Sequence, residues 1–348
     1  VLILGDSFTF GDQTSDQSTW PSCLERKLSI NTCGKVVVPQ RPELDDQLEI
    51  LASRGEKNGA KVEIWNKNKL HDFMPEACTS SGRALWSPNT CVVSPIEVLN
   101  RLFEELKNKG VKFFNKNDFS GNTYSVDVDS SIITLSNEIK IKYKYLINCA
   151  GLGADKLAHK YKVGFNYKIM PFKGLYWELK SPEKFNIKSN LYPVPDLNVP
   201  FLGVHFTRTI NGFIEAGPNA VLAWAREGYG KTDINFLEMW DYLSYRGFWR
   251  MARKYWTTAI GEYYRSLSKS AFLNALQELV PDIKSEDIMQ GSSGVRAQAL
   301  SLDGKLLDDF VINNTRNMTH VINAPSPAAT SALAIGNYIS NIYSREKI

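Results

Sequence analysis

The chain has 348 residues, of which 43% are hydrophobic and 22% charged, and its formal net charge is +4. These values are ordinary for a globular protein, and the length favours two domains. The mild charge, without a Lys/Arg run, argues against nucleic-acid binding. The 5 cysteines are scattered and form no CxxC pair, so we expect no metal site, no disulfide framework and a reducing, cytoplasmic location. No apolar run reaches the length of a membrane span, and no secretory or transit segment is recognised.

The first half of the chain alternates short apolar runs with helical patterns. The helix predicted last in this half has the clearest signals, because Ser94 can cap it, Pro95 suits its first position and Glu97 is spaced for a capping box. Its predicted apolar face consists of Val98, Leu99, Leu102 and Leu106. In chain order, the predicted strands are 1–5, 36–38, 62–65 and 111–115, and the predicted helices are 20–30, 43–58 and 94–109.

The second half differs between its middle and its ends. In chain order, we predict a hairpin at 123–135, a strand at 140–149 that leads through a glycine turn into a helix at 154–160, and a strand-and-turn region at 167–225. These are followed by a helical region at 233–280, two strands at 294–300 and 320–324, and a final helix that begins at 325–328. Strands and helices therefore alternate at both ends, around an antiparallel middle. This order predicts an α/β domain (α+β overall) with an antiparallel-sheet domain inserted into it.

The glycine turn after the strand at 140–149 is a candidate cofactor site. Ala150, Gly151 and Leu152 lie in it. Glycines allow a backbone to approach a dinucleotide closely, and the N-terminus of a helix favours an anionic phosphate. Any strand-to-helix turn can also use glycines for structural reasons alone, so both interpretations stay open.

A second candidate cofactor site lies in the tail. Ser326 is a natural N-cap and Pro327 a natural first helical residue, and Ala328, Ala329 and Thr330 follow them. The N-terminus of a helix can stabilise negative charge on a reduced cofactor. A well-capped surface helix has the same pattern and is the alternative.

Arg296 is the candidate for binding a substrate carboxylate. It follows Gly294 on a predicted strand. Its guanidinium group can donate two parallel hydrogen bonds, which suits a carboxylate. The alternative, favoured by the residues alone, is a structural ion pair with Asp303, Asp308 or Asp309.

Together with their neighbours, these segments resemble the L-2-hydroxyglutarate oxidase/dehydrogenase family of D-amino-acid-oxidase-like flavoproteins. The resemblance runs from about Cys33 to the C-terminus, and so many ordered motifs are improbable by chance. The most specific motifs are YPVPD at 192–196, FLGVHFTR at 201–208, GPNAVLA at 217–223 and REGY at 226–229. Others are CGKVVV at 33–38, SPNT at 87–90, PFKGLY at 171–176, GVRAQ at 294–298, DGKL at 303–306 and NAPSPAAT at 323–330.

The resemblance implies a Rossmann-like FAD-binding domain with an inserted substrate domain. Residues 31–90 and 165–290 would form the substrate-binding domain, and 91–164 with 291–348 the FAD-binding domain. Residues 1–30 would replace the usual start of the Rossmann-like domain.

The resemblance also implies a reaction and the residues that perform it. A 2-hydroxy dicarboxylate, L-2-hydroxyglutarate, would be oxidised to 2-oxoglutarate by hydride transfer to flavin N5, with a quinone-type compound or oxygen as electron acceptor. His205 is the candidate base, because an imidazole titrates near neutral pH; a hydrogen-bonded strand histidine is the alternative. Arg296 and Lys173 are the candidate carboxylate contacts. Further substrate contacts are Arg208, Tyr176 and Asn219, and the expected FAD contacts are Ala150, Gly151, Leu152, Gly294, Arg296, Ser326, Pro327, Ala328, Ala329 and Thr330.

The chain departs from this family at its start. The Gly-x-Gly-x-x-Gly turn and the ribose-binding acid have no counterpart, and Cys91 stands where the family usually has Gly. Loss of two charge-assisted hydrogen bonds, at roughly 1.5–3 kcal/mol each, would weaken FAD binding about a hundredfold or more. A non-catalytic remnant or fusion product without flavin is therefore the alternative.

Residues 1–30 resemble instead the first block of SGNH/GDSL hydrolases, through LGDSFTFG at 4–11. In that family Ser7 would be the nucleophile, which needs a base and an orienting acid. No His of the chain has an Asp three residues before it. An esterase is thus a weaker alternative, and the strand, turn and helix of this segment could instead stand in for the missing Rossmann start.

The aromatic helical region around 246–259 suggests a membrane contact. Trp249 and Trp256 lie there among Arg246, Arg250 and Arg253. A basic amphipathic helix of this kind can lie on an anionic membrane surface, such as the inner membrane. A helix packed on the substrate domain is the alternative, and the pattern favours it.

Overall fold

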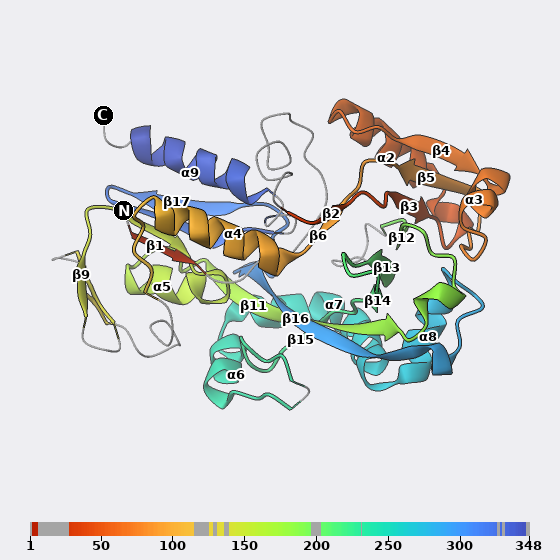
Figure 1. Ribbon diagram of the computed structural model, residues 1–348. Helices are drawn as coiled ribbons and strands as arrows, with labels where there is room; N and C mark the ends of the chain where they lie inside the picture. The colour runs from red at the N-terminus through yellow and green to blue at the C-terminus, as the bar shows by residue number, and fades with distance from the viewer. Residues whose placement is uncertain are drawn as a thin grey trace.

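Two main β-sheets with helices around them make up the described part of this computed structural model (Figure 1). The side chains and backbone are described for residues 28–114, 131–135, 139–195, 203–230, 232–325, 328 and 331–344, and the backbone alone for 2–5, 125–127 and 345. The mixed α/β fold predicted from the sequence is confirmed. No described helix is both long and apolar enough to cross a membrane.

The smaller sheet has the parallel strands of a Rossmann-like domain. Within the described residues its order is β1 (Leu2–Gly5), β10 (Leu146–Cys149), β18 (Met318–Asn323) and β17 (Val311–Thr315). β1, β10 and β18 run parallel, whereas β17 is antiparallel to β18. The first residues of the chain therefore form a strand parallel to β10, as a Rossmann-like sheet requires of its opening strand.

Successive residues of β10 face different helices. Leu146 packs with Leu157 of α5 (Ala154–Lys160), and Ile147 packs with Ile339 of α9 (Ala332–Arg345). This alternation places one helix on each face of the sheet. The carboxyl ends of the three parallel strands meet at one edge, which is where open α/β sheets bind their ligands.

The larger sheet is mostly antiparallel and is built around two long strands. β11 (Tyr167–Leu179) pairs with β16 (Ile288–Ser301), with an irregularity between Leu175 and Trp177. β12 and β3 are the one parallel pair among its described strands. β16 runs across the domain boundary expected after residue 290, and the division into domains stays a proposal. Its other strands are β15 (Val221–Leu222), β14 (Ile214–Gly217), β13 (His205–Arg208), β12 (Asn190–Pro193), β3 (Lys35–Val38), β5 (Arg83–Ser87) and β4 (Glu63–Asn66).

Helices and small sheets surround this frame. The helices are η1 (Pro42–Leu44), α2 (Asp46–Lys57), α3 (Lys67–Phe73), α4 (Pro95–Asn108), η2 (Gly151–Gly153), η3 (Pro182–Lys184), α6 (Phe236–Leu243), α7 (Arg246–Leu267), α8 (Lys269–Gln277) and η4 (Ser285–Asp287). The remaining strands are β2 (Ile30–Asn31), β6 (Val92–Val93), β7 (Ser125–Asp127), β8 (Ile132–Thr134) and β9 (Lys140–Lys142).

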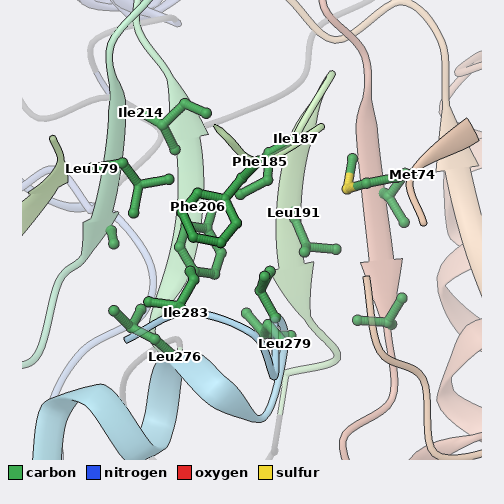
Figure 2. Close-up of a cluster of buried hydrophobic side chains, with 14 of the residues drawn as sticks. Met74, Leu179, Phe185, Ile187, Leu191, Phe206, Ile214, Leu276, Leu279 and Ile283 are labelled. Atoms are coloured by element: carbon green, nitrogen blue, oxygen red, sulfur yellow. The ribbon is translucent and has the colours of Figure 1, made fainter. Parts of the chain in front are cut away.

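The main core lies between the larger sheet and α8. Leu276 of α8 and Leu279 just after it pack against Leu191 of β12 and Phe206 of β13 (Figure 2). All four side chains are fully buried, and each contributes about 1.5–3 kcal/mol of burial free energy. This core holds in place the strand that carries His205.

The predicted helix at 94–109 is confirmed as α4, but not all of its details are. The Ser94 hydroxyl accepts a hydrogen bond from Glu97 N–H at 3.3 Å, as a cap should. The Glu97 carboxylate accepts from Ser29 N–H at 3.1 Å, a partner outside the capping box. Of the expected apolar face only Val98 is buried, whereas Leu99 is exposed.

Some predicted elements are wrong at their bounds. The strand expected at 140–149 is divided into β9 and β10, and residues 111–114 form no strand. Of the helix expected at 20–30, residues 20–27 lie outside the described residues, and Ile30 begins β2. α9 begins at Ala332, and before it Ala328 N–H donates to the Pro325 carbonyl at 3.0 Å. Ser331 and not Ser326 therefore holds the position before the helix.

Buried His320 on β18 predicts a pH-dependent stability. Its Nδ1 accepts from Asn148 Nδ2 at 3.1 Å, its Nε2 has no partner among the described residues, and burial lowers its pKa from 6.5 to about 4. Between these two pKa values the unfolded chain binds a proton that the folded chain does not. Stability is therefore complete above the unfolded pKa and is lost as the pH falls, by about 2 kcal/mol between pH 7 and pH 5.

Urea unfolding at pH 7 and pH 5 tests this expectation. His320→Leu should remove this part of the pH dependence, since Asn148 Nδ2 keeps its bond to the Ala154 carbonyl at 2.9 Å. His71→Leu, at an exposed position, is the matched control. An equal pH dependence in the His320→Leu variant and the unaltered chain would contradict the expectation.

Candidate active site

Arg296 is a half-buried cation that no described carboxylate neutralises. It lies on β16 opposite Phe172 of β11. Its Nε is buried without a hydrogen-bond partner among the described residues, and no described carboxylate pairs with it. Burial lowers its pKa, and neighbouring Tyr176 opposes this shift. A buried guanidinium without a counter-charge is costly, so this geometry suits a bound anion.

The alternative ion pairs of Arg296 are not formed. Asp303 accepts from the Ser301 hydroxyl, and Asp308 lies 3.8 Å from Lys305 Nζ. Asp309 accepts from Phe310 N–H at 2.7 Å. The ion pairs with Asp303, Asp308 or Asp309 that the residues alone suggested are therefore not formed, because these carboxylates have local partners.

Tyr176 lies beside Arg296 at the irregular point of the β11–β16 ribbon. Burial and the nearby Glu215 carboxylate raise its pKa to about 12, although Arg296 acts to lower it. Its hydroxyl is therefore protonated at neutral pH. It can donate a hydrogen bond next to the guanidinium group.

Lys173 lies on the same ribbon, opposite Val295. Its Nζ donates to the Gly230 carbonyl at 2.7 Å. Burial lowers its pKa, and Asp233 partly offsets this effect. Lys173 and Arg296 thus lie on neighbouring rungs of one ladder, but because side chains alternate along a strand, Lys173 shares the face of Val295 and Arg296 the opposite face with Phe172.

His205 is connected to Tyr176 across the sheet through a glycine. His205 lies opposite Gly217 on β14, and a Cβ at Gly217 would lie 3.2 Å from the Tyr176 ring. The imidazole stacks on Tyr192 at 3.9 Å between centroids, and its Nδ1 donates to the Gly203 carbonyl at 3.0 Å. This bond selects the neutral tautomer whose Nε2 carries the lone pair, as a proton acceptor needs.

Arg208 and Asn219 are both held by backbone groups. Arg208 Nη1 donates to the Ile187 carbonyl at 2.9 Å. The Asn219 carbonyl oxygen accepts from Leu175 N–H at 3.0 Å, which ties its loop to β11 beside Tyr176. These contacts describe positioning roles, and a direct substrate contact of either residue stays a prediction.

The glycine turn after β10 holds a carboxylate of the chain itself. Gly151 has φ +49°, and Ala150 N–H donates to the Asn148 side chain at 3.1 Å. In the first turn of α5, Asp155 accepts from Lys156 N–H at 2.8 Å. The helix end expected to favour an anionic phosphate is therefore already next to Asp155, and Ala150, Gly151 and Leu152 remain candidate backbone contacts.

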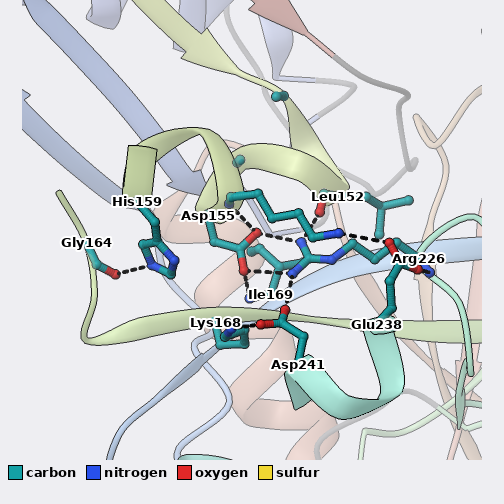
Figure 3. Close-up of polar contacts among 12 residues, drawn as sticks. Leu152, Asp155, His159, Gly164, Lys168, Ile169, Arg226, Glu238 and Asp241 are labelled. Carbon is teal, nitrogen blue, oxygen red and sulfur yellow. Dashed lines mark hydrogen bonds and ion pairs between the residues drawn. The ribbon is translucent and has the colours of Figure 1, made fainter. Parts of the chain in front are cut away.

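Sequence reasoning missed the buried ion pair of Asp155 with Arg226 (Figure 3). Arg226 Nη1 and Nη2 lie 2.5 and 2.9 Å from the two carboxylate oxygens, and Nη1 also donates to the Leu152 carbonyl. Asp155 is fully buried, which acts to raise its pKa, but Arg226 and Ile169 N–H lower it below its ordinary value. Arg226 opens the REGY motif of the resemblance, but no sequence pattern links it to Asp155.

The tail residues and a surface hollow tell less about the candidate site. Ser326, Pro327, Ala329 and Thr330 lie outside the described residues, as does Ser7 of the esterase alternative. A Cβ at Gly294 would meet no atom within 4 Å, so the strand beside Arg296 is open on that side. An open hollow of about 540 Å³ lies away from these residues, at the start of α4, and is lined by Ser29, Ile30, Asn31, Ser94, Glu97, Ile210 and Asn211.

Known proteins are similar to this chain in sequence and in fold. Residues 18–342 match the model of a family described as FAD dependent oxidoreductase. An L-2-hydroxyglutarate dehydrogenase of Indibacter alkaliphilus is 42% identical over 320 residues, which are 91% of this chain and 79% of the relative. A mitochondrial L-2-hydroxyglutarate dehydrogenase of Nematostella vectensis is 39% identical, over 93% of this chain and 74% of the relative.

Solved structures agree on the fold. An FAD-bound L-α-glycerophosphate oxidase from Mycoplasma pneumoniae has a TM-score of 0.67 at 18% identity, over 88% of this chain and 72% of the other. A glycine oxidase from Geobacillus kaustophilus has a TM-score of 0.63 at 13% identity, over 92% of this chain and 74% of the other. The flavoprotein prediction is confirmed by these likenesses, and the esterase alternative receives no support from them.

Proposed function

Because the chain belongs to the FAD dependent oxidoreductase family, we propose that it oxidises L-2-hydroxyglutarate to 2-oxoglutarate. The relatives that share 42% and 39% of their aligned residues with it act on this compound by name. The observation that carries the proposal is Arg296, whose Nε is buried without a hydrogen-bond partner among the described residues. A dicarboxylate needs such cationic partners, and Lys173 is the candidate for its second carboxylate.

The described residues fit the family's cofactor, FAD. The carboxyl ends of three parallel strands form the edge where such sheets bind dinucleotides, and the open side of β16 at Gly294 leaves room beside Arg296. The proposed contacts are Ala150, Gly151, Leu152, Gly294 and Arg296, with Ser326, Pro327, Ala328, Ala329 and Thr330 in the tail. When bound, FAD supplies the acceptor for the two electrons and the Cα hydrogen of the substrate.

The chain's own residues bind and orient the substrate in this proposal. Arg296 and Lys173 hold the carboxylates, and Tyr176 donates a hydrogen bond beside Arg296. His205 Nε2 takes the hydroxyl proton as the carbonyl forms, and the Gly203 carbonyl stabilises the resulting imidazolium through Nδ1–H.

The visible spectrum of the purified chain tests this function. We expect flavin absorbance that bleaches when L-2-hydroxyglutarate is added without air, and no bleaching with the D enantiomer. Re-oxidation by a soluble quinone or by oxygen then distinguishes the two proposed acceptor classes. A colourless chain that takes up no added FAD would support the non-catalytic remnant instead.

We also propose that this chain docks on an anionic bilayer through α6 and α7. One side of α7 packs inward through Phe248 and Met251, which agrees with the packed-helix alternative. Another side carries apolar residues into solvent, among them Trp256 at 59% and Leu267 at 86% exposure. The aromatic surface consists of Phe236, Leu237, Trp240, Trp249, Trp256, Ile260, Tyr264 and Leu267.

The basic residues of α7 favour a lipid bilayer as the partner that binds the aromatic surface. Arg246, Arg250, Arg253 and Lys254 are all exposed on α7. Tryptophan with basic residues is the composition of helices that lie at the headgroup level of a membrane. A quinone-type acceptor dissolved in the bilayer would then be close to the protein.

Vesicle co-sedimentation measures this docking. We expect binding to vesicles with phosphatidylglycerol, little binding to pure phosphatidylcholine, and release by salt. Replacing Trp249, Trp256 and Ile260 with Ser should abolish binding, while Tyr338→Ser on α9, at a similarly exposed aromatic, should not. Concentration-dependent dimers without vesicle binding would contradict the proposal.

A further inference from the structure

The segment 223–230, which follows β15, touches both parts of the proposed active site. Near its start, Arg226 reaches the glycine turn, where it binds Asp155 and the Leu152 carbonyl (Figure 3). Its side chain is almost completely buried. Asp155 in turn accepts from Ile169 N–H at 2.9 Å, four residues before Lys173 on β11.

The other end of the same segment lies at the substrate-binding ribbon. The Gly230 carbonyl accepts from Lys173 Nζ at 2.7 Å, and the Tyr229 carbonyl accepts from the Ser293 hydroxyl at 2.7 Å. Ser293 directly precedes Gly294, and Asp233 closes the end of the segment by accepting from Gly230 N–H at 2.7 Å. Only three residues of chain thus separate Arg226, which clamps the turn, from Gly230, whose carbonyl holds the amine expected to bind a carboxylate.

We infer that Arg226 is a positioning residue that couples the glycine turn to Lys173, so that a dicarboxylate bound at Lys173 orders the turn and FAD bound at the turn orders Lys173. This inference rests on the proposed function, which supplies the two ligands. Coupling of this kind is reciprocal, because each ligand changes the affinity of the other by the same factor. The geometry favours Arg226 because its guanidinium joins the turn to a segment whose backbone holds Lys173.

Amide hydrogen exchange of the chain without added flavin tests the inference directly. The probe is glutarate, a five-carbon dicarboxylate without the hydroxyl group. We expect glutarate to slow exchange about fivefold or more both around Lys173 and in the turn at 150–156. In Arg226→Lys the slowing around Lys173 should persist while that in the turn disappears. Arg316→Lys, at an exposed position, is the control and should retain both.

FAD affinity gives a second measurement. Glutarate should tighten FAD binding in the unaltered chain, and Arg226→Lys should bring the ratio of the two dissociation constants close to one. A purely structural role would weaken FAD equally with and without glutarate and leave the ratio unchanged. If Arg226→Lys does not fold, Ser293→Ala, which removes only the bond to Tyr229, should lower the same ratio.

The outcomes separate this inference from the proposed function. Glutarate protection around Lys173 that never reaches the turn would overturn the coupling and leave the proposed substrate class intact. No protection at either place would overturn both. If glutarate still protects the turn in both Arg226→Lys and Ser293→Ala, then neither Arg226 nor the segment 223–230 carries the coupling.

Discussion

Arg296→Met should lower kcat/KM for L-2-hydroxyglutarate by about 10²–10⁴-fold. Two charge-assisted hydrogen bonds to a carboxylate contribute roughly 1.5–3 kcal/mol each, and each 1.4 kcal/mol is a factor of about ten. The effect should be large because the Nε of Arg296 is buried without a hydrogen-bond partner among the described residues, which leaves it to bind the substrate. Steady-state kinetics with L-2-hydroxyglutarate measure it.

Two further variants make this result specific to the guanidinium group. Arg296→Lys keeps the charge but loses the planar fork, so it should recover only part of the activity. Arg316→Met removes a cation from an exposed turn and should leave the kinetics unchanged. An Arg296→Met enzyme with unchanged kcat/KM would show that the carboxylate binds elsewhere.

Arg226→Met should destabilise the fold by about 3–5 kcal/mol, because it leaves the buried Asp155 carboxylate without its counter-charge. The pair's contribution has a definite pH dependence. Since the pKa of Asp155 is below its ordinary value of 3.8, the stabilisation is present above that value and is lost as the pH falls below it. Urea unfolding near neutral pH measures the loss.

Two comparisons show whether the cost comes from the unpaired carboxylate. Arg226→Met combined with Asp155→Asn should regain part of the stability, since no charge is then left buried. Lys69→Met breaks the exposed pair with Glu63 and should cost far less stability, because solvent screens this pair. If Arg226→Met costs no more than Lys69→Met, the buried pair is not what joins α5 to the segment after β15.

Local signals predicted most of the regular structure. The helix at 154–160 and the capped start of α4 at Ser94 follow from residues within one or two turns. Signals failed where a distant partner decided or where a helix started later than its cap pattern indicated. Glu97 bonds to Ser29 from another part of the chain, and α9 begins at Ala332 although Ser326 and Pro327 have the composition of a helix start.

The sequence by itself determined the family, the mixed α/β fold and the residue types that the chemistry needs, because motifs, periodicity and caps are local properties of the chain. Only the tertiary structure decided which of these residues meet. The β11–β16 register sets Arg296 opposite Phe172 and Lys173 opposite Val295, and Gly217 links His205 to Tyr176 across two strands. The Arg226–Asp155 pair joins the segment after β15 to α5. Such long-range contacts depend on register and packing, which local sequence patterns do not encode.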